Sequence, residues 1–239
     1  MFSFKRNLKK PYVSVVIAAG GSSARMNSEN KLLMYIGDKP VLAHTFLAFE
    51  NSDLIDEIIL SAHPDNMINY ADIAGKYNIT KLSKVIKGGA TRLQSVYNAA
   101  VEVSDKTDIL LVHDAARPLV TSLDIDNVIN SVVKHKAAAA ANIMKDTVKK
   151  VKDNLAIETV DRNELVTVQT PQGADKALLL AALKKAVENE DGTVTDECSA
   201  LEKIGVQPFM CPCSSCNVKI TYPEDLFIAN AIYDRREEK

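Results

Sequence analysis

The first half of the chain alternates short apolar runs with longer amphipathic stretches. The runs at 13–18 and 109–113 are almost wholly apolar, which is typical of strands buried on both faces of a sheet. Further strands are predicted at 57–61 and 82–86, and helices at about 40–50, 65–77 and 91–103. Strands that alternate with helices in this way predict right-handed βαβ units and a mostly parallel sheet, that is, an α/β fold.

The pattern changes near residue 137. Short β-prone stretches at 148–151, 157–160 and 165–168 are separated by polar turns such as Lys152-Asp153-Asn154. We therefore predict one domain spanning residues 1–239, with an antiparallel arm inserted at about 137–168. The five alanines from 137 to 141 receive only a structural interpretation. Later elements are predicted as helices at 174–190 and 195–204, a strand at 218–221 and a helix from Pro223 onward.

Composition excludes several classes of function. The chain has 239 residues, 46% apolar and 25% charged, as expected of a globular protein with a sizeable core. Its 29 basic and 31 acidic residues give a net charge of −2, so nothing global favours nucleic acid or an anionic membrane. The apolar run at 13–19 is too short to span a bilayer and leads into glycines rather than a cleavage region. Phosphate binding would have to come from local clusters.

Three of the four cysteines form a CxCxxC cluster, Cys211, Cys213 and Cys216, and the fourth is Cys198. A structural zinc site needs four ligands at suitable spacing, and no histidine lies nearby in sequence. Reduced thiols in a cytoplasmic protein are therefore the favoured interpretation, and a zinc site is the alternative.

Two glycine-rich loops follow predicted strands. The first, AAGGSSARM at 18–26, lies where open α/β sheets bind ligands, and Arg25 and Lys31 add positive charge there. The second begins at Gly88-Gly89, which would leave room for a flat base, and Ser95 is placed to hydrogen-bond a base edge. Neither loop matches the GxxxxGK[ST] or GxGxxG pattern. The alternative is a pair of plain strand-to-helix turns, with Arg92 a solvated cation.

The sequence HDAARP at 113–118 follows the fourth predicted strand. Asp114 is placed to hold Mg²⁺ or a substrate hydroxyl, because Mg²⁺ needs only one or two carboxylates besides substrate phosphates. Arg117 is suited to grip a phosphate with two hydrogen bonds. We interpret His113 as a packed histidine at a strand end rather than as a proton shuttle.

Five cations lie beside predicted strand ends or loops: Arg25, Lys31, Arg117, Arg162 and Lys219. Phosphoryl and nucleotidyl transfer are catalysed mainly by positioning and charge neutralisation, so this set suits that chemistry. For the segments around Thr147, Arg162 and Lys219, ordinary turn chemistry and a solvated lysine remain alternatives.

Taken in order, several motifs resemble those of the 2-C-methyl-D-erythritol 4-phosphate cytidylyltransferases of the non-mevalonate isoprenoid pathway. They are AAGGSSARM, Lys31, GGxxRxxSV, HDAARP, VDRNEL, QTPQ, TDE and NVKIT, and the resemblance covers about 13–231. It implies a Rossmann-like α/β domain whose β-arm helps to form a homodimer. It also implies transfer of CMP from CTP to methylerythritol phosphate, with Mg²⁺ or another divalent cation, by in-line attack of the substrate phosphate on the α-phosphorus.

The resemblance also implies a role for each matching residue. The cytidine-binding positions would be Ala18, Ala19, Gly20, Gly88 and Ser95. Those placed on the triphosphate and its transition state would be Arg25, Lys31 and Lys219. Those near the polyol phosphate would be Asp114, Arg117, Thr147, Arg162, Thr170 and Lys219, with Thr147 and Arg162 reaching the partner subunit's site from the arm.

The sequence departs from the family pattern at two positions. Asn30 precedes Lys31 where many members carry proline, and Ala90 follows the second glycine pair where many carry aspartate. The nearest alternative is a cytidylyltransferase for ribitol 5-phosphate or another polyol phosphate, although HDAARP and VDRNEL favour methylerythritol phosphate. A dinucleotide-dependent oxidoreductase would need GxGxxG after the first strand, and a non-catalytic nucleotide-binding module would not need so many cations.

Overall fold

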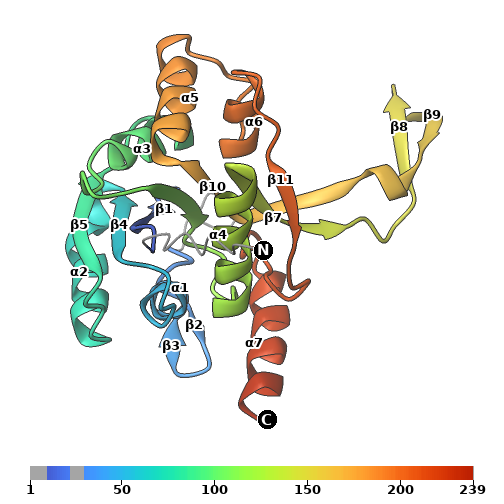
Figure 1. The fold of residues 1–239 in the computed structure, drawn as a ribbon. Helices are drawn as coiled ribbons and strands as arrows, with labels where there is room; N and C mark the ends of the chain where they lie inside the picture. Colours follow the sequence, from blue (N-terminus) through green and yellow to red (C-terminus); the bar gives the residue numbers. More distant parts are fainter. Residues whose placement is uncertain (1–9, 22–29, 239) are drawn as a thin grey trace, which may run out of the picture.

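A seven-stranded sheet forms the centre of the molecule (Figure 1), a computed structural model in which residues 10–21 and 30–238 are described. Its strand order is β11-β7-β10-β6-β1-β4-β5. The strands are β1 (Val13–Ala19), β4 (Glu57–Ala62), β5 (Leu82–Lys87), β6 (Ile109–Asp114), β7 (Ala137–Ile143), β10 (Val166–Asp175) and β11 (Phe209–Pro212). Only β10 runs antiparallel to its neighbours within this sheet, so the predicted α/β fold with a mostly parallel sheet is confirmed.

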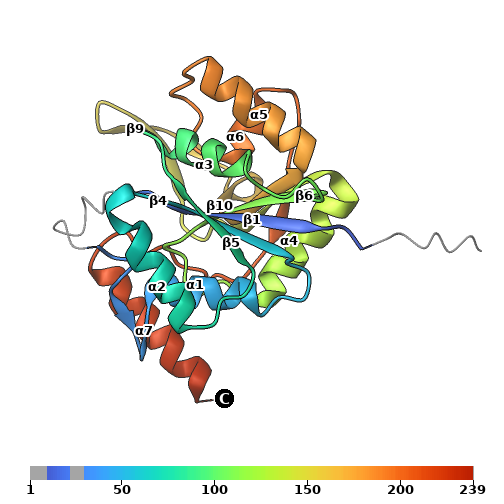
Figure 2. The ribbon, with the colours of Figure 1, turned by 90° about the vertical axis from the view of Figure 1, so that its left-hand side faces the viewer.

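Helices cover both faces of the sheet (Figure 2). One face carries α3 (Arg92–Ala100), α5 (Lys176–Glu188) and α6 (Glu197–Glu202); the other carries α1 (Val41–Glu50), α2 (Met67–Lys76) and α4 (Ser122–His135). Successive residues of β6 point to opposite faces of the sheet. Leu111 packs in the hydrophobic core on the face covered by α1, whereas Leu110 and Val112 pack in the core on the face covered by α3. Burial on both faces is why the sequence of this strand is continuously apolar.

Smaller elements complete the chain. A hairpin of β2 (Tyr35–Ile36) and β3 (Lys39–Pro40) lies against the C-terminal helix α7 (Glu224–Glu237). The described residues also include the short 3-10 turns η2 (Pro64–Asn66) and η3 (Arg162–Glu164). None of the helices in the described part of the chain is both long and apolar enough to span a bilayer.

The predicted strand at 218–221 is wrong. No strand in the described part of the chain pairs with this segment; it is tied to the loop after β6, where the Ile220 amide donates to the Ala116 carbonyl at 2.8 Å. The strand that does form near the C-terminal end is β11, which the sequence did not reveal. It is only four residues long and pairs at the sheet edge with β7 alone, so it carries little apolar signal.

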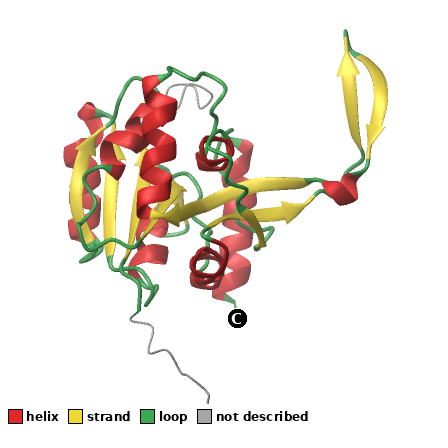
Figure 3. Cartoon of the chain, turned by 45° about the horizontal axis from the view of Figure 1, so that its top comes forward, coloured by secondary structure: helices red, strands yellow, loops and turns green. Residues whose placement is uncertain are grey.

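The arm is shorter than the predicted 137–168. Residues 137–141 are the five alanines, and they are 0–2% exposed in the central sheet, paired with β10 and β11. Beyond them the hairpin of β8 (Val148–Lys152) and β9 (Leu155–Val160) projects from the sheet (Figure 3). Its turn residues Asp153 and Asn154 have φ of 50° and 64°, the left-handed values that a tight hairpin turn requires.

Candidate active site

A cavity of about 370 Å³ lies at the carboxyl ends of the parallel strands β1 and β6. Ligands of open α/β sheets bind at this edge. Seven of the predicted site residues line the cavity: Ala18, Ala19, Gly20, Lys31, Ser95, Asp114 and Lys219. The fold therefore brings together residues that are up to about 200 positions apart in the chain.

Ser95 shapes the part of the cavity between the two glycine loops. Its hydroxyl donates to the Thr91 carbonyl at 2.8 Å and accepts from the Gly89 amide at 3.0 Å. A Cβ added to Gly20 would lie 3.3 Å from Ser95 Oγ, and one added to Gly88 would lie 3.0 Å from it. A Cβ at either position would contact Ser95 more closely than side chains normally do, so Ser95 would have to shift by a few tenths of an ångström; glycine avoids this contact. Gly88 thus acts on the shape of the loop, while Gly89 lines the cavity itself.

Asp114, at the end of β6, is surrounded by three cations. Its Oδ2 accepts from Lys219 Nζ at 2.7 Å and lies 3.9 Å from Arg117 Nε, and its Oδ1 accepts from Arg92 Nη2 at 3.2 Å. Burial by itself would raise the pKa of Asp114, but the charges of Arg92 and Lys219 outweigh burial and hold that pKa well below its usual range. Asp114 is therefore an ionised carboxylate that orients cations at the cavity wall.

A buried hydrogen-bond chain supports Asp114 from behind. The Thr170 hydroxyl accepts from the Asp114 amide at 3.1 Å and lies 3.1 Å from His113 Nδ1, while His113 Nε2 lies 3.2 Å from the Arg117 carbonyl. A carbonyl can only accept, so Nε2 carries the ring proton and Nδ1 accepts from Thr170. Burial lowers the pKa of His113 to about 4, and the neutral ring agrees with a packed rather than a proton-shuttling histidine.

The segment that carries Lys219 is fixed by contacts with distant parts of the chain. Asn217 is fully buried and donates from Nδ2 to the Thr170 carbonyl at 2.8 Å, and its own carbonyl accepts from Arg117 Nη1 at 2.9 Å. Lys31 Nζ donates to the Ile220 carbonyl at 2.8 Å. These contacts place Lys219 and Lys31 at the same cavity without a regular strand.

Some predicted site residues lie outside the cavity. Arg117 and Thr170 flank Asp114 from the protein side and are not among the cavity-lining residues. Thr147 and Arg162 are exposed on the arm, where Arg162 Nη1 donates to the Lys145 carbonyl at 2.8 Å. The arm extends away from the sheet that holds the cavity (Figure 3). Arg25 lies outside the described residues.

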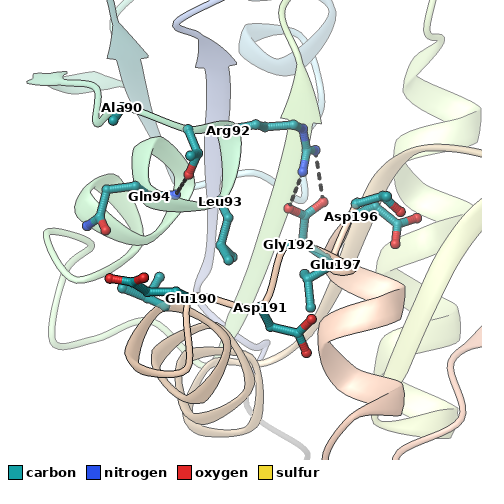
Figure 4. Close-up of a pocket in the computed structure, with 13 residues that line it drawn as sticks. Ala90, Arg92, Leu93, Gln94, Glu190, Asp191, Gly192, Asp196 and Glu197 are labelled. Atoms are coloured by element: carbon teal, nitrogen blue, oxygen red, sulfur yellow. Dashed lines mark hydrogen bonds and ion pairs between the residues drawn. The ribbon is translucent and has the colours of Figure 1, made fainter.

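A second cavity, of about 600 Å³, lies on the other side of Arg92, between the start of α3 and the residues that lead into α6 (Figure 4). Arg92 pairs there with Glu197, which is 1% exposed. From the sequence, a solvated cation was the alternative interpretation of Arg92, and neither Arg92 nor Glu197 was predicted as a site residue, although both lie in motifs of the family resemblance. The signals available were an arginine directly after a glycine pair and an acidic residue in the TDE motif, and neither specifies a partner.

Comparisons with known proteins agree on one family. The family model described as IspD, 2-C-methyl-D-erythritol 4-phosphate cytidylyltransferase, matches residues 13–235. A protein of that name from Clostridium botulinum is 42% identical over 225 residues, covering 93% of this chain and 97% of the relative. One from Halalkalibacterium halodurans is 38% identical over 227 residues, covering 95% and 99%. The chain belongs to this cytidylyltransferase family.

Solved structures of the cytidylyltransferase family share the fold. The 4-diphosphocytidyl-2C-methyl-D-erythritol synthase from Anaerococcus prevotii superimposes with a TM-score of 0.84 at 29% identity, over 95% of this chain and all of that one. A Francisella tularensis 2-C-methyl-D-erythritol 4-phosphate cytidylyltransferase gives 0.78 at 30% identity, over 92% and 99%. The arrangement of sheet, helices and cavity-lining loops described above is thus set in a known cytidylyltransferase fold.

The departure from the cytidylyltransferase pattern before Lys31 has a structural substitute. Asn30 Nδ2 donates to Tyr70 Oη at 2.9 Å and to Asn66 Oδ1 at 3.1 Å, and Asn30 Oδ1 accepts from the Leu32 amide at 3.1 Å. Tyr70 is 1% exposed on α2. Side-chain hydrogen bonds of Asn30 to α2, to the residue before it and to the Leu32 amide therefore hold the segment that carries Lys31.

Proposed function

We propose that this protein transfers CMP from CTP to 2-C-methyl-D-erythritol 4-phosphate and releases pyrophosphate. Family membership supports the reaction class and both substrates. The observation that carries the proposal for this chain is the ionised Asp114 held among Lys219, Arg92 and Arg117 at the cavity where β1 and β6 end. A cation-rich pocket at this edge suits a reaction between two phosphate-bearing substrates.

The residues suit in-line attack of the substrate phosphate on the α-phosphorus of CTP. The attacking phosphate is already anionic, so the reaction needs no strong general base. The buried neutral His113 therefore has no role as a base in this proposal. Lys219 uses one of the three N–H donors of its ammonium group on Asp114, and Lys31 lines the same cavity. In our proposal these lysines, with Arg25, stabilise the charge that develops on the phosphate oxygens.

We further propose that a divalent cation, Mg²⁺ or a similar ion, enters with the triphosphate. Mg²⁺ usually takes one or two carboxylates besides substrate phosphates, and Asp114 is the one carboxylate among the described residues that line this cavity. Both Asp114 oxygens are held by cations, so a direct bond to the metal would require Lys219 or Arg92 to give way. When bound, the ion would neutralise phosphate charge and help pyrophosphate to leave.

The arm is proposed to form a homodimer in which Thr147 and Arg162 reach the partner subunit's polyol phosphate. Its supporting observation is apolar exposure: Ile143 is 74% exposed, Leu155 71% and Ile157 58%. Several exposed large apolar side chains on one projecting element are a mark of an interaction surface. A cytoplasmic location stays a prediction from the sequence.

The deciding experiment is an assay of pyrophosphate release with CTP and Mg²⁺. Methylerythritol phosphate and ribitol 5-phosphate are supplied in parallel reactions, each with a no-enzyme control. Release with methylerythritol phosphate alone is expected. Release only with ribitol 5-phosphate would keep the chemistry and change the substrate, and no release with either would contradict an active cytidylyltransferase.

A further inference from the structure

Arg92 lies between two carboxylates, one from each cavity it separates. Its Nη1 and Nη2 donate to the two oxygens of Glu197 at 2.9 and 3.1 Å, and its Nε and Nη2 donate to Asp114 Oδ1 at 3.3 and 3.2 Å (Figure 4 shows the Glu197 side). These bonds use four of the five N–H donors of a guanidinium group. Little of its hydrogen-bonding capacity is left for a phosphate.

Glu197 is the firmer partner of the two. Both of its oxygens bind Arg92 in the parallel two-bond geometry that matches a guanidinium fork, and its bonds are shorter than those from Arg92 to Asp114. Glu197 is 1% exposed, and a buried carboxylate left without its cation would be strongly destabilising. Glu197, at the start of α6, therefore determines the position of the Arg92 guanidinium.

The start of α6 is in turn fixed to the strand next to β6. Gln172 of β10 donates from Nε2 to Asp196 Oδ2 at 3.0 Å and accepts at Oε1 from the Cys198 amide at 3.0 Å. Asp196 caps the helix, accepting from the Ser199 amide at 2.9 Å. Glu197 thus sits between two anchored residues and its side chain has one defined direction.

We propose that Glu197 is a positioning residue for the cytidylyl transfer: it holds Arg92 against Asp114, so that Asp114 presents a fixed carboxylate to the polyol phosphate. Arg92 then stays hydrogen-bonded to Asp114 at the wall of the cavity of about 370 Å³. Its guanidinium is kept from moving further into the space that the triphosphate would occupy. The inference rests on the proposed function, in which Asp114 lies near the polyol phosphate.

The charge count around the site agrees with this role. Burial raises the pKa of Glu197, but its paired contact with the Arg92 guanidinium opposes this, so we count it as ionised. The ion-paired group of Arg92, Arg117 and Lys219 with Asp114 and Glu197 then has three positive and two negative charges, which leaves +1, and Lys31 adds a further positive charge at the cavity. Without Glu197 the same group carries +2, and Arg92 becomes an extra cation facing the cavity that the triphosphate would enter.

The test is Glu197→Gln, which keeps the side-chain shape and removes the charge and one acceptor. We expect kcat/KM for the polyol phosphate to fall about 10- to 100-fold, because a misplaced site group costs that much, while KM for CTP does not rise. Arg92→Lys, which keeps the charge without the fork, should give a similar loss. Because both changes break the same link, the double variant should be no worse than either single one.

Asp191→Asn is the matched control, since Asp191 lines the same second cavity but pairs with Lys203 at 3.2 Å. It should leave both kinetic parameters unchanged. Normal kinetics in folded Glu197→Gln, equal effects on both substrates, or additive losses in the double variant would overturn the positioning role. An inactive wild-type enzyme would instead contradict the proposed function.

A crystal structure of Glu197→Gln gives a readout that needs no activity. We expect the Arg92 guanidinium to lie beyond hydrogen-bond distance, about 3.5 Å, from Asp114 Oδ1. If Arg92 keeps its hydrogen bonds to Asp114 in this variant, the inference is overturned, regardless of the measured activity.

Discussion

At the scale of single residues, the site is a set of charges whose positions depend on buried partners. Asp114 is ionised because cations surround it, and those cations are held by Asn217, Glu197 and the chain of Thr170 and His113. A solvated lysine beside an aspartate would be mobile; here the supporting hydrogen bonds restrict each group to one geometry. Preorganised charge of this kind is what stabilises a phosphoryl transition state without further rearrangement.

Lys219→Ala should reduce turnover far more than stability. Loss of one charge that stabilises a transition state costs on the order of 100- to 1,000-fold in kcat. The lysine side chain is 39% exposed, and Asp114 keeps Arg92 and Arg117 as partners, so the free energy of unfolding should change by about 1 kcal/mol or less. Steady-state kinetics and urea unfolding measure the two effects. The control is Lys84→Ala, which removes an exposed ion pair on β5; near-normal turnover in Lys219→Ala would contradict the assignment.

His113 should make stability fall on acidification. Its native pKa of about 4 lies below the ordinary value of 6.5, so between these pH values the unfolded chain binds a proton that the native protein does not. The free energy of unfolding therefore decreases as pH falls from about 6.5 to 4, by at most about 1.4 kcal/mol per pH unit from this group.

Urea unfolding at pH 7, 6 and 5 tests this effect of His113. The quantity to compare is the slope of the free energy of unfolding against pH, rather than the free energy at one pH. The slope should be reduced in His113→Gln and kept in His63→Gln, which replaces an exposed histidine. Identical slopes in wild type and His113→Gln would show that another group is responsible.

At the scale of elements, β10 connects the arm to the site. It pairs with β7 along the arm and in the sheet, then with β6 beside Asp114, and it supplies Thr170 and Gln172 on the way. One strand thus supports Asp114 directly and the start of α6 through Gln172. From the sequence, only the first part of β10 was predicted as a strand, at 165–168, and a helix was predicted from 174, whereas the strand continues to Asp175.

Gly173→Ala should destabilise the fold through this strand. A Cβ at Gly173 would collide with Leu111 Cδ2 and lie 2.5 Å from the Leu110 carbonyl oxygen, both on β6. Overpacking of this kind costs about 1–3 kcal/mol, which corresponds to a melting temperature lower by about 3–10 °C. Differential scanning calorimetry measures it. Gly75→Ala, on the exposed side of α2 with nothing within 4 Å, should instead stabilise by about 0.5–1 kcal/mol; equal effects would contradict the packing argument.

At the scale of the whole molecule, the arm separates two predicted substrate residues from the cavity they should serve. Thr147 and Arg162 lie on the projecting arm, whereas Asp114 and Lys219 line the cavity at the edge of the sheet. In a homodimer joined through the arms, each site would combine a cavity from one subunit with Arg162 of the other. This proposal makes complementation between inactive variants a direct test.

Lys219→Ala and Arg162→Ala, each inactive alone, should restore activity when their subunits are mixed by co-refolding. Half of the randomly formed dimers are mixed, and half of the sites in each are intact, so about one quarter of wild-type activity is expected. Mixing Lys219→Ala with Lys31→Ala is the control, because both residues line one cavity and no intact site can form. The absence of restored activity in a protein that sediments as a mixed dimer would contradict shared sites.

The sequence by itself determined the features that depend on neighbouring residues. Alternating apolar runs specify the βαβ units, glycine pairs specify the close loops at strand ends, and HDAARP places a carboxylate at the end of a buried strand. The tertiary structure decided the features that depend on distant partners. Arg92 with Glu197 and Asp114 with Lys219 are each 105 positions apart, and no local pattern selects such pairs. The alanines of β7 carry weak strand propensity, and pairing with β10 and β11 on both sides is what makes them a buried strand.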